Sequence, residues 1–229
     1  LELVVASEAA ETGSEKILIT NEKVLKHVQK NLAIYDKGGE QHYDIISAFI
    51  KSLRGSDPNA AVYWLARMVE GGEDPKFIAR RMLILAAEDI GLANPNALLL
   101  AQTCFEAINV IGWPESRIIL AEAAVYLATS PKSNATYMAI ENAQALVREK
   151  GDLPVPLHIR NAPTKLMKDL GYGREYKYAH SYEGNFIRDN FLPEEIKGIK
   201  LYEPGTTPKE EEIRKKLEGL WKGIYDYRK

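Results

Sequence analysis

The chain of 229 residues lacks most features that would place it in a specialised class. Its single cysteine, Cys104, excludes an internal disulfide bond and is typical of a reducing cytoplasm. The longest apolar run, MLILAA at 82–87, is far shorter than the ~18 residues of a membrane span, and LELVVASEAA at the start lacks the basic flank of a signal peptide. A net charge of −2 gives no overall attraction to nucleic acid. These absences predict a cytoplasmic protein without a membrane partner.

Motifs for chemistry are also missing from the sequence. There is no G-x-x-x-x-G-K-[ST] loop, so nothing would cradle nucleotide phosphates or hold magnesium. The four histidines are widely separated, and none has a metal-ligand partner three or four residues away. No serine or cysteine stands in a nucleophile motif. We therefore expect no catalytic residue, cofactor or metal in this chain.

What the sequence does contain is a series of short helices that begin at proline. The five prolines in question are Pro58, Pro75, Pro95, Pro114 and Pro131. Four of them follow a residue that caps helices well: Asp57, Asp74, Asn94 and Ser130. The segments end near glycines that suit a helix terminus, at 71, 91, 112 and 151. The pattern predicts an all-α fold, a bundle of antiparallel short helices.

The character of the chain changes after residue 152. Pro154, Pro156 and Pro163 forbid a continuous helix and favour an extended path. Further on, Thr207 and Glu210 form a T-x-x-E capping box that would open a charged terminal helix. We therefore expect an extended C-terminal arm that ends in a helix.

Five longer motifs together resemble one family. They are RGSDPNAAVYWLARMVEGGEDP, AAEDIGLANP, LATSPKSNA, VPLHIRNAPTKLMKDLGYG and FLPEEIKG, in this order along the chain. The sequence is similar to the region that follows the ATPase domain in the RarA/MgsA family of AAA+ ATPases. These are relatives of clamp loaders, with a eukaryotic member that binds the Werner helicase.

The resemblance implies a domain order and a function. Residues 1–34 would be a remnant of the AAA+ lid domain, cut inside a helix, and 35–41 a linker. Residues 42–152 would form the collar-like oligomerisation bundle of a homotetramer, and 153–229 the C-terminal arm and terminal helix. The full-length protein would be a DNA-dependent ATPase, with ATP and magnesium as cofactors, that acts in replication-fork maintenance, recombination and repair. Its partners would be single-stranded or forked DNA, single-stranded-DNA-binding protein and the replication machinery. The chain alone, without the phosphate-binding loop, would be inactive.

The segment 158–182 is the candidate DNA-binding patch. Its basic residues are Arg160, Lys165, Lys168, Arg174 and Lys177; five charges minus those of Asp169 and Glu175 leave +3. Tyrosines are interleaved with them at 172, 176, 178 and 182. Tyr172 and Tyr176, which lie on either side of Arg174, are the candidates for stacking on bases. Basic groups that follow phosphates and aromatic rings that stack on bases are the combination of single-strand binders. Alternatively, the arm wraps the bundle and buries its tyrosines as anchors.

Glu88 and Asp89 fall in the last turn of a predicted helix, where the helix dipole disfavours carboxylates. The pattern indicates a fixed cationic partner, with Arg54, Arg67, Arg80 and Arg81 as candidates. A structural ion-pair network between helices is one interpretation, and a subunit contact and a catalytic or metal role are the others.

Tyr63 and Trp64 are neighbours on a helix, about 100° apart, so both cannot share the core direction of Val62, Leu65 and Val69. Either one of them faces a partner subunit, since both residue types are favoured at interfaces, or both pack in the core. Two other functions stay open for the whole region. It could be a helical peptide-binding adaptor, or a stand-alone DNA-binding module.

Overall fold

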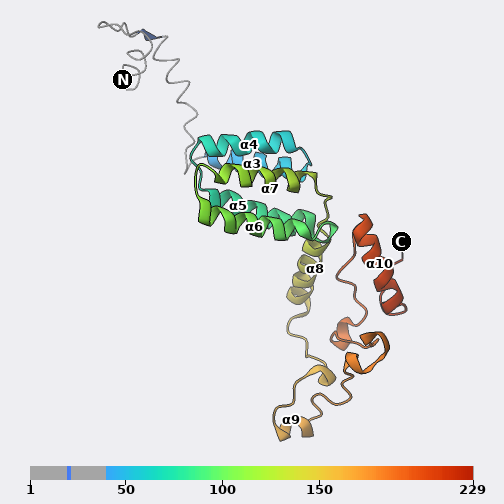
Figure 1. The fold of residues 1–229 in the computed structure, drawn as a ribbon. Helices are drawn as coiled ribbons and strands as arrows, with labels where there is room; N and C mark the ends of the chain where they lie inside the picture. Colours follow the sequence, from blue (N-terminus) through green and yellow to red (C-terminus); the bar gives the residue numbers. More distant parts are fainter. Residues whose placement is uncertain (1–19, 22–39, 229) are drawn as a thin grey trace. The chain divides into compact units, whose positions relative to one another are not determined.

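The computed structural model describes residues 20–21 and 40–228 (Figure 1). These residues form α-helices, short 3-10 and π-helical turns and connecting loops, and no β-strand occurs among them. The all-α prediction is therefore confirmed. The antiparallel arrangement and the domain boundaries stay predictions. The lid remnant at 1–34, apart from its residues 20 and 21, and most of the linker at 35–41 lie outside the described residues.

The chain divides into two compact units. The first comprises the residues up to Met82 together with Thr103–Thr129, and the second comprises Leu83–Gln102 and Ser130–Lys229. Helices α5 (Pro75–Leu85) and α6 (Asn96–Ile111) contribute residues to both units. The predicted boundary between 152 and 153 falls inside the second unit.

The first unit has an apolar core. Helices α3 (Glu40–Arg54), α4 (Pro58–Glu70) and α7 (Ser116–Thr129) pack against one another. The large side chains at their centre have no more than 2% of their surface exposed: Phe49, Leu53, Leu65, Met68, Leu120 and Leu127. Three buried alanines of α7, at 123, 124 and 128, let the neighbouring backbones approach closely. Burial of such side chains stabilises a fold by about 1.5–3 kcal/mol each.

Of the three residues predicted to share the core direction of α4, Leu65 is buried, Val69 is half-buried and Val62 is exposed. Ala61, Leu65 and Met68 are buried, whereas Val62 is 37% exposed. Positions 61, 65 and 68 follow the i, i+4, i+7 spacing of one helix face. Val62 points about 100° away from Ala61. The small alanine lies in the core because α4 packs against both α3 and α7.

Two of the five predicted helix starts are confirmed at the proline itself. Helix α4 begins at Pro58, and the Asp57 carboxylate accepts hydrogen bonds from the amides of Asn59 and Ala60, both at 3.0 Å. Helix α5 begins at Pro75, and the Asp74 carboxylate accepts the amide hydrogen of Lys76 at 2.9 Å. In both places the carboxylate binds amides that have no partner within the helix, as the pattern predicted.

The other three helices begin later than predicted. Helix α6 begins one residue after Pro95, α7 begins at Ser116 after a turn at 113–115, and α8 (Ala135–Lys150) begins four residues after Pro131. The prediction that Ser130 caps a helix was wrong. Its hydroxyl instead accepts a hydrogen bond from the Asn94 side-chain amide at 3.1 Å. These two residues are 36 positions apart, so no local pattern could reveal the contact.

The helix predicted to begin at Pro75 and to end near Gly91 changes type before its end. It is α-helical to Leu85 and then π-helical over Ala86–Ile90, and Gly91 follows with a positive φ of 49°. An added Cβ at Gly91 would lie 3.0 Å from the Thr136 hydroxyl and 3.3 Å from the Ser133 carbonyl. The Ser133 amide also donates to the Asp89 carbonyl at 2.8 Å. The π-turn and glycine therefore let the 133–136 segment approach this backbone closely.

The second unit also contains the arm, which winds through short helical turns before α10 (Pro208–Trp221) (Figure 1). The predicted capping box is confirmed. The Thr207 hydroxyl accepts the Glu210 amide at 3.4 Å and donates to the Glu210 carboxylate at 2.9 Å. The same carboxylate, which is fully buried, accepts a hydrogen bond from the Ser133 hydroxyl at 2.7 Å. Glu210 thus joins the start of α10 to the loop before α8.

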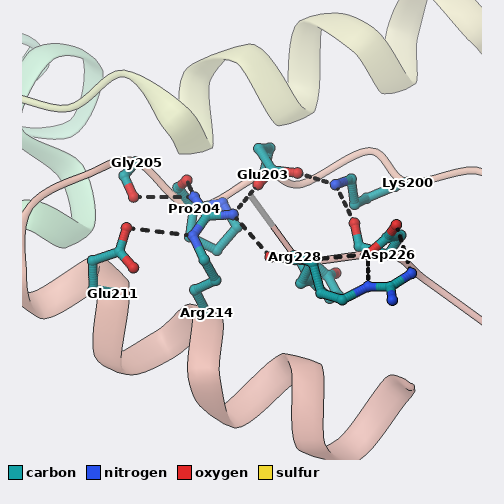
Figure 2. A network of polar contacts seen from close by, with 9 residues as sticks. Lys200, Glu203, Pro204, Gly205, Glu211, Arg214, Asp226 and Arg228 are labelled. Carbon is teal, nitrogen blue, oxygen red and sulfur yellow. Dashed lines mark hydrogen bonds and ion pairs between the residues drawn. The ribbon is translucent and has the colours of Figure 1, made fainter. Parts of the chain in front are cut away.

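A second polar cluster holds the end of the chain against α10 (Figure 2). The buried guanidinium of Arg214 donates to the Glu203 carboxylate, to the carbonyls of Pro204 and Gly205, and to the carbonyl of Tyr227. These acceptors come from the segment before α10 and from the segment after it. Arg214 therefore holds the segments before and after α10 against this helix.

Candidate functional site

The candidate DNA-binding residues of 158–182 separate into two groups in the structure. Arg160 belongs to the first group, because its side chain is already engaged within the arm. Its Nε donates to the Val155 carbonyl at 2.6 Å, and its guanidinium lies over the Tyr172 ring at 5.0 Å and donates to the Tyr172 hydroxyl at 3.1 Å. The contact between Arg160 and Tyr172 thus holds the VPLHIRNAP stretch next to the GYG stretch at 171–173.

Lys177 is also engaged. Its ammonium group lies 3.2 Å from the Asp189 carboxylate. Burial acts to raise the pKa of Asp189, but the Asn190 amide and Lys177 outweigh it and hold this pKa below its ordinary value. This acid lies outside 158–182 and was not counted in the predicted charge of +3. The local positive charge at Lys177 is therefore smaller than the sequence suggested.

The second group is exposed. Lys165 and Lys168 lie on the short helix α9 (Lys165–Asp169), which Thr164 caps by accepting the Met167 amide at 3.3 Å. Arg174 is exposed as well, and the side chain of Tyr176 is 54% exposed. Tyr178 and Tyr182 are 58% and 47% exposed. These three rings are therefore not buried within the arm itself. The structure leaves three basic groups and three aromatic rings available to a ligand.

Glu88 and Asp89 lie in the π-helical turn, and both are half-buried. A cation near Asp89 is Lys132, which was not among the predicted partners. Burial lowers the pKa of Lys132, and the Asp89 carboxylate acts in the opposite direction. The Lys132 ammonium group also donates to the Ser130 carbonyl at 2.7 Å. The only signal for this residue was its place in the motif LATSPKSNA.

Of the arginines proposed for the ion-pair network, Arg67 lies over a ring. Its guanidinium carbon is 5.7 Å from the centre of the Trp64 ring. Arg80 and Arg81 are exposed on α5. The predicted network of Arg67, Arg80, Arg81, Glu88 and Asp89 stays a prediction.

Tyr63 and Trp64 lie on the outer side of α4. Tyr63 is 57% exposed and Trp64 is half-buried, and the two rings meet edge to face at 5.0 Å between their centres. Neither ring is in the apolar core of the first unit. Together with Arg67 they form a small aromatic and cationic surface of the type that interfaces favour.

Neither a cluster of metal ligands nor a membrane-spanning helix occurs within the described part of the chain. No group of three or more histidine, cysteine or acidic side chains there could hold a metal ion. No helix in these ranges is long and apolar enough to cross a membrane.

These features define a class: an all-α region with exposed aromatic and basic residues and without a nucleotide-binding loop. The family model described as MgsA AAA+ ATPase C terminal matches residues 55–221, and the one described as AAA C-terminal domain matches residues 1–54. The chain therefore belongs to the RarA/MgsA family of AAA+ ATPases and matches its C-terminal region.

Several curated proteins are similar to the chain over most of its length. Replication-associated recombination protein A of Coxiella burnetii is 43% identical over 95% of the chain, and that of Bacillus subtilis is 42% identical over 99%. These matches cover 49% and 52% of the two relatives. ATPase WRNIP1 of Dictyostelium discoideum is 43% identical over 82% of the chain and 22% of its own length. The chain thus spans about half the length, or less, of these relatives.

Proposed function

We propose that the chain is the oligomerisation region of a DNA-dependent AAA+ ATPase that acts in replication-associated recombination and repair. The names of its relatives support the process, because several are replication-associated recombination proteins. The observation that carries the oligomerisation role is the outer surface of α4. A well-packed helix there exposes Tyr63 beside Trp64 and Arg67, residue types enriched at the centres of interfaces.

In this proposal the chain holds the ATPase modules of a homotetramer together. The full-length protein would bind ATP and magnesium through residues that this chain does not contain. Its partners would include single-stranded-DNA-binding protein and the replication machinery. A peptide-binding adaptor remains the competing function, and it would use a groove of exposed apolar residues instead of a self-complementary surface.

Light scattering on the 229-residue chain across a concentration series tests the proposal. We expect a particle of about four times the 25.7 kDa chain mass at high concentration. A strict monomer at every concentration would contradict the oligomerisation role. Trp64→Ala should split the tetramer into smaller particles, and Ala66→Ser, at an exposed position of the same helix, serves as the matched control.

A second function, contact with single-stranded DNA, is favoured by the exposed rings and charges of the arm. Lys165, Lys168 and Arg174 offer three charges to phosphates, and the exposed ring of Tyr176 could stack on a base. This contact would help to guide DNA past the ATPase modules. Calorimetric titration with ATP and magnesium tests whether this chain also binds nucleotide. A stoichiometric micromolar ATP site on this chain would contradict the role proposed for it.

A further inference from the structure

Helix α8 presents an apolar stripe to solvent that no prediction addressed. All sixteen residues of α8 are described, and none of them is buried. One face is half-buried against the π-helix and the 3-10 turn that follows it. Beside that face, Tyr137 is 40% exposed, Ile140 54% and Val147 61%. Side chains of this kind on a helix surface are typical of a partner-binding face.

The spacing of the stripe is that of helix–helix pairing. Tyr137, Ile140, Gln144 and Val147 are separated by three, four and three residues, which is the alternation of the a and d positions of a heptad. Gln144 is the one polar member and lies near the middle of the stripe. A polar residue at such a position fixes the register of a helix pair, because its amide must meet a hydrogen-bonding partner.

The charges beside the stripe identify the partner. Glu141 and Arg148 are exposed, seven residues apart, and flank the same edge of the stripe. If two copies of α8 pair antiparallel about a two-fold axis near Gln144, Glu141 of each copy faces Arg148 of the other. In a parallel pair each would instead face the opposite edge, which carries Ala143 and no acidic residue. The surface is therefore complementary to itself in one orientation, as an isologous interface requires.

An apolar groove lies at the C-terminal end of the stripe. The groove, of about 320 Å³, is formed by the last turns of α8 with Leu153 on one side and by Leu192, Pro193, Ile196 and Leu201 on the other. It is continuous with the stripe at Val147 and reaches Gly151. In an antiparallel pair centred on Gln144, Tyr137 of the second copy lies opposite Gly151. A tyrosine that enters an apolar groove is a common anchor of protein interfaces.

From these observations we infer that α8 is a two-fold contact between copies of this chain, paired antiparallel about Gln144. The inference rests on the proposed oligomerisation role and names the surface for one of its contacts. Tyr63 and Trp64 lie in the other unit, so they would belong to a separate contact.

Cysteine cross-linking tests the geometry. Gln144→Cys places a thiol beside the axis, where two copies can form a disulfide bond under a mild oxidant. Asn142→Cys, exposed on the opposite side of the same helix, is the matched control. The natural Cys104 does not interfere, because it is 3% exposed and burial, with Glu122, raises its pKa to about 11. We expect dimers from Gln144→Cys only; equal cross-linking of both variants, or none of the first, would overturn the inference.

Charge reversal gives an independent test on the same chain. Glu141→Arg or Arg148→Glu alone should raise the dissociation constant about tenfold or more, because two attractive contacts become repulsive. The double variant restores both contacts and should recover most of the affinity. Failure of the double variant to recover, with a native circular dichroism spectrum, would contradict the pairing. A monomeric natural chain would instead contradict the proposed oligomerisation role itself.

Discussion

The interior of each of the two units is stabilised by a different kind of interaction. In the first unit the centre is apolar, with Phe49, Leu53, Met68 and Leu127 removed from solvent. In the arm of the second unit, the buried groups include the carboxylate of Glu210 and the guanidinium of Arg214. Apolar packing tolerates small shifts of its members, whereas a buried charge requires each hydrogen bond to be made. The arm should therefore depend on few residues, and the helical unit on many.

The chain has natural reporters for this comparison. Trp64 and Trp113 lie in the first unit and Trp221 in the second. Trp221 packs edge to face against Phe186 at 5.4 Å and lies near Tyr225 at the same distance. Variants that keep one tryptophan each would show which unit unfolds in a denaturant series.

The largest effect is expected in the first unit. Leu127→Ala removes a fully buried side chain from α7 and leaves a cavity, so unfolding of this unit should become easier by about 3–5 kcal/mol. Urea titration followed by Trp64 fluorescence measures the change. Ile118→Ala, on the same helix but 58% exposed, is the control and should change stability by less than about 0.5 kcal/mol. Equal effects of the two would refute the apolar core described for this unit.

A smaller but more local effect is expected from Arg214→Met. The methionine keeps much of the length of the side chain but removes the donor to the carbonyls of Pro204 and Tyr227, and it leaves the Glu203 carboxylate with Lys200 alone. Loss of charge-assisted hydrogen bonds of this kind costs about 1.5–3 kcal/mol. Trp221 should report unfolding at lower urea, while Trp64 should report no change. Lys215→Met, exposed on the same helix, is the control. A parallel shift of both tryptophans would mean that the two units do not unfold independently.

Binding of single-stranded DNA should be weak and should separate the engaged residues of the arm from the exposed ones. Three phosphate contacts from Lys165, Lys168 and Arg174 give a log–log salt slope of about −2. Lys165→Ala with Lys168→Ala should flatten it by about 1.4. Tyr176→Ala should cost about 1 kcal/mol with little change in slope. Fluorescence anisotropy with a labelled oligonucleotide measures both quantities. If Lys177→Ala flattens the slope as much as Lys168→Ala, the pairing of Lys177 with Asp189 does not remove it from the DNA contact.

The smallest expected effect is a loss of stability of the second unit at low pH. Burial acts to raise the pKa of Glu203, but hydrogen bonds from Lys200 and Arg214 outweigh it and hold this pKa below its ordinary value. A carboxyl whose pKa is lowered by folding stabilises the protein above its unfolded pKa, and this contribution is lost as pH falls through the folded pKa. The second unit should therefore lose stability below about pH 4.5, the ordinary range of a glutamate. In Glu203→Gln this acid dependence, followed by Trp221, should be reduced; an unchanged pH profile would exclude Glu203 as its source.

Much of the fold followed from local patterns in the sequence. The starts of α4 and α5 were predictable because Asp57 and Asp74 act on amides two or three residues away. The capping box at Thr207 was predictable for the same reason. The missed features depend on residues far apart in the chain. Ser130 binds Asn94, and the loop that follows it meets the π-turn, so α8 begins late.

The candidate site shows the same division. Composition and spacing identified the basic and tyrosine-rich segment at 158–182, but could not show which members were already engaged. Arg160 contacts a tyrosine twelve residues away, and Lys177 an acid outside the segment. The aromatic pair on α4 was recognised as ambiguous because two adjacent helical residues cannot share one direction. In the structure Tyr63 is exposed and Trp64 is half-buried, and the subunit contact stays a prediction.

The sequence by itself determined the all-α class, the family and the helices whose starts are fixed by a neighbouring side chain. These depend on local hydrogen bonds and on motifs that can be read in order. Only the tertiary structure decided that Glu210 is joined to a serine 77 residues away, that Lys132 lies near Asp89, and that α8 keeps an apolar stripe exposed. Helical periodicity reveals that a face is apolar, but whether another element covers that face depends on how distant segments pack.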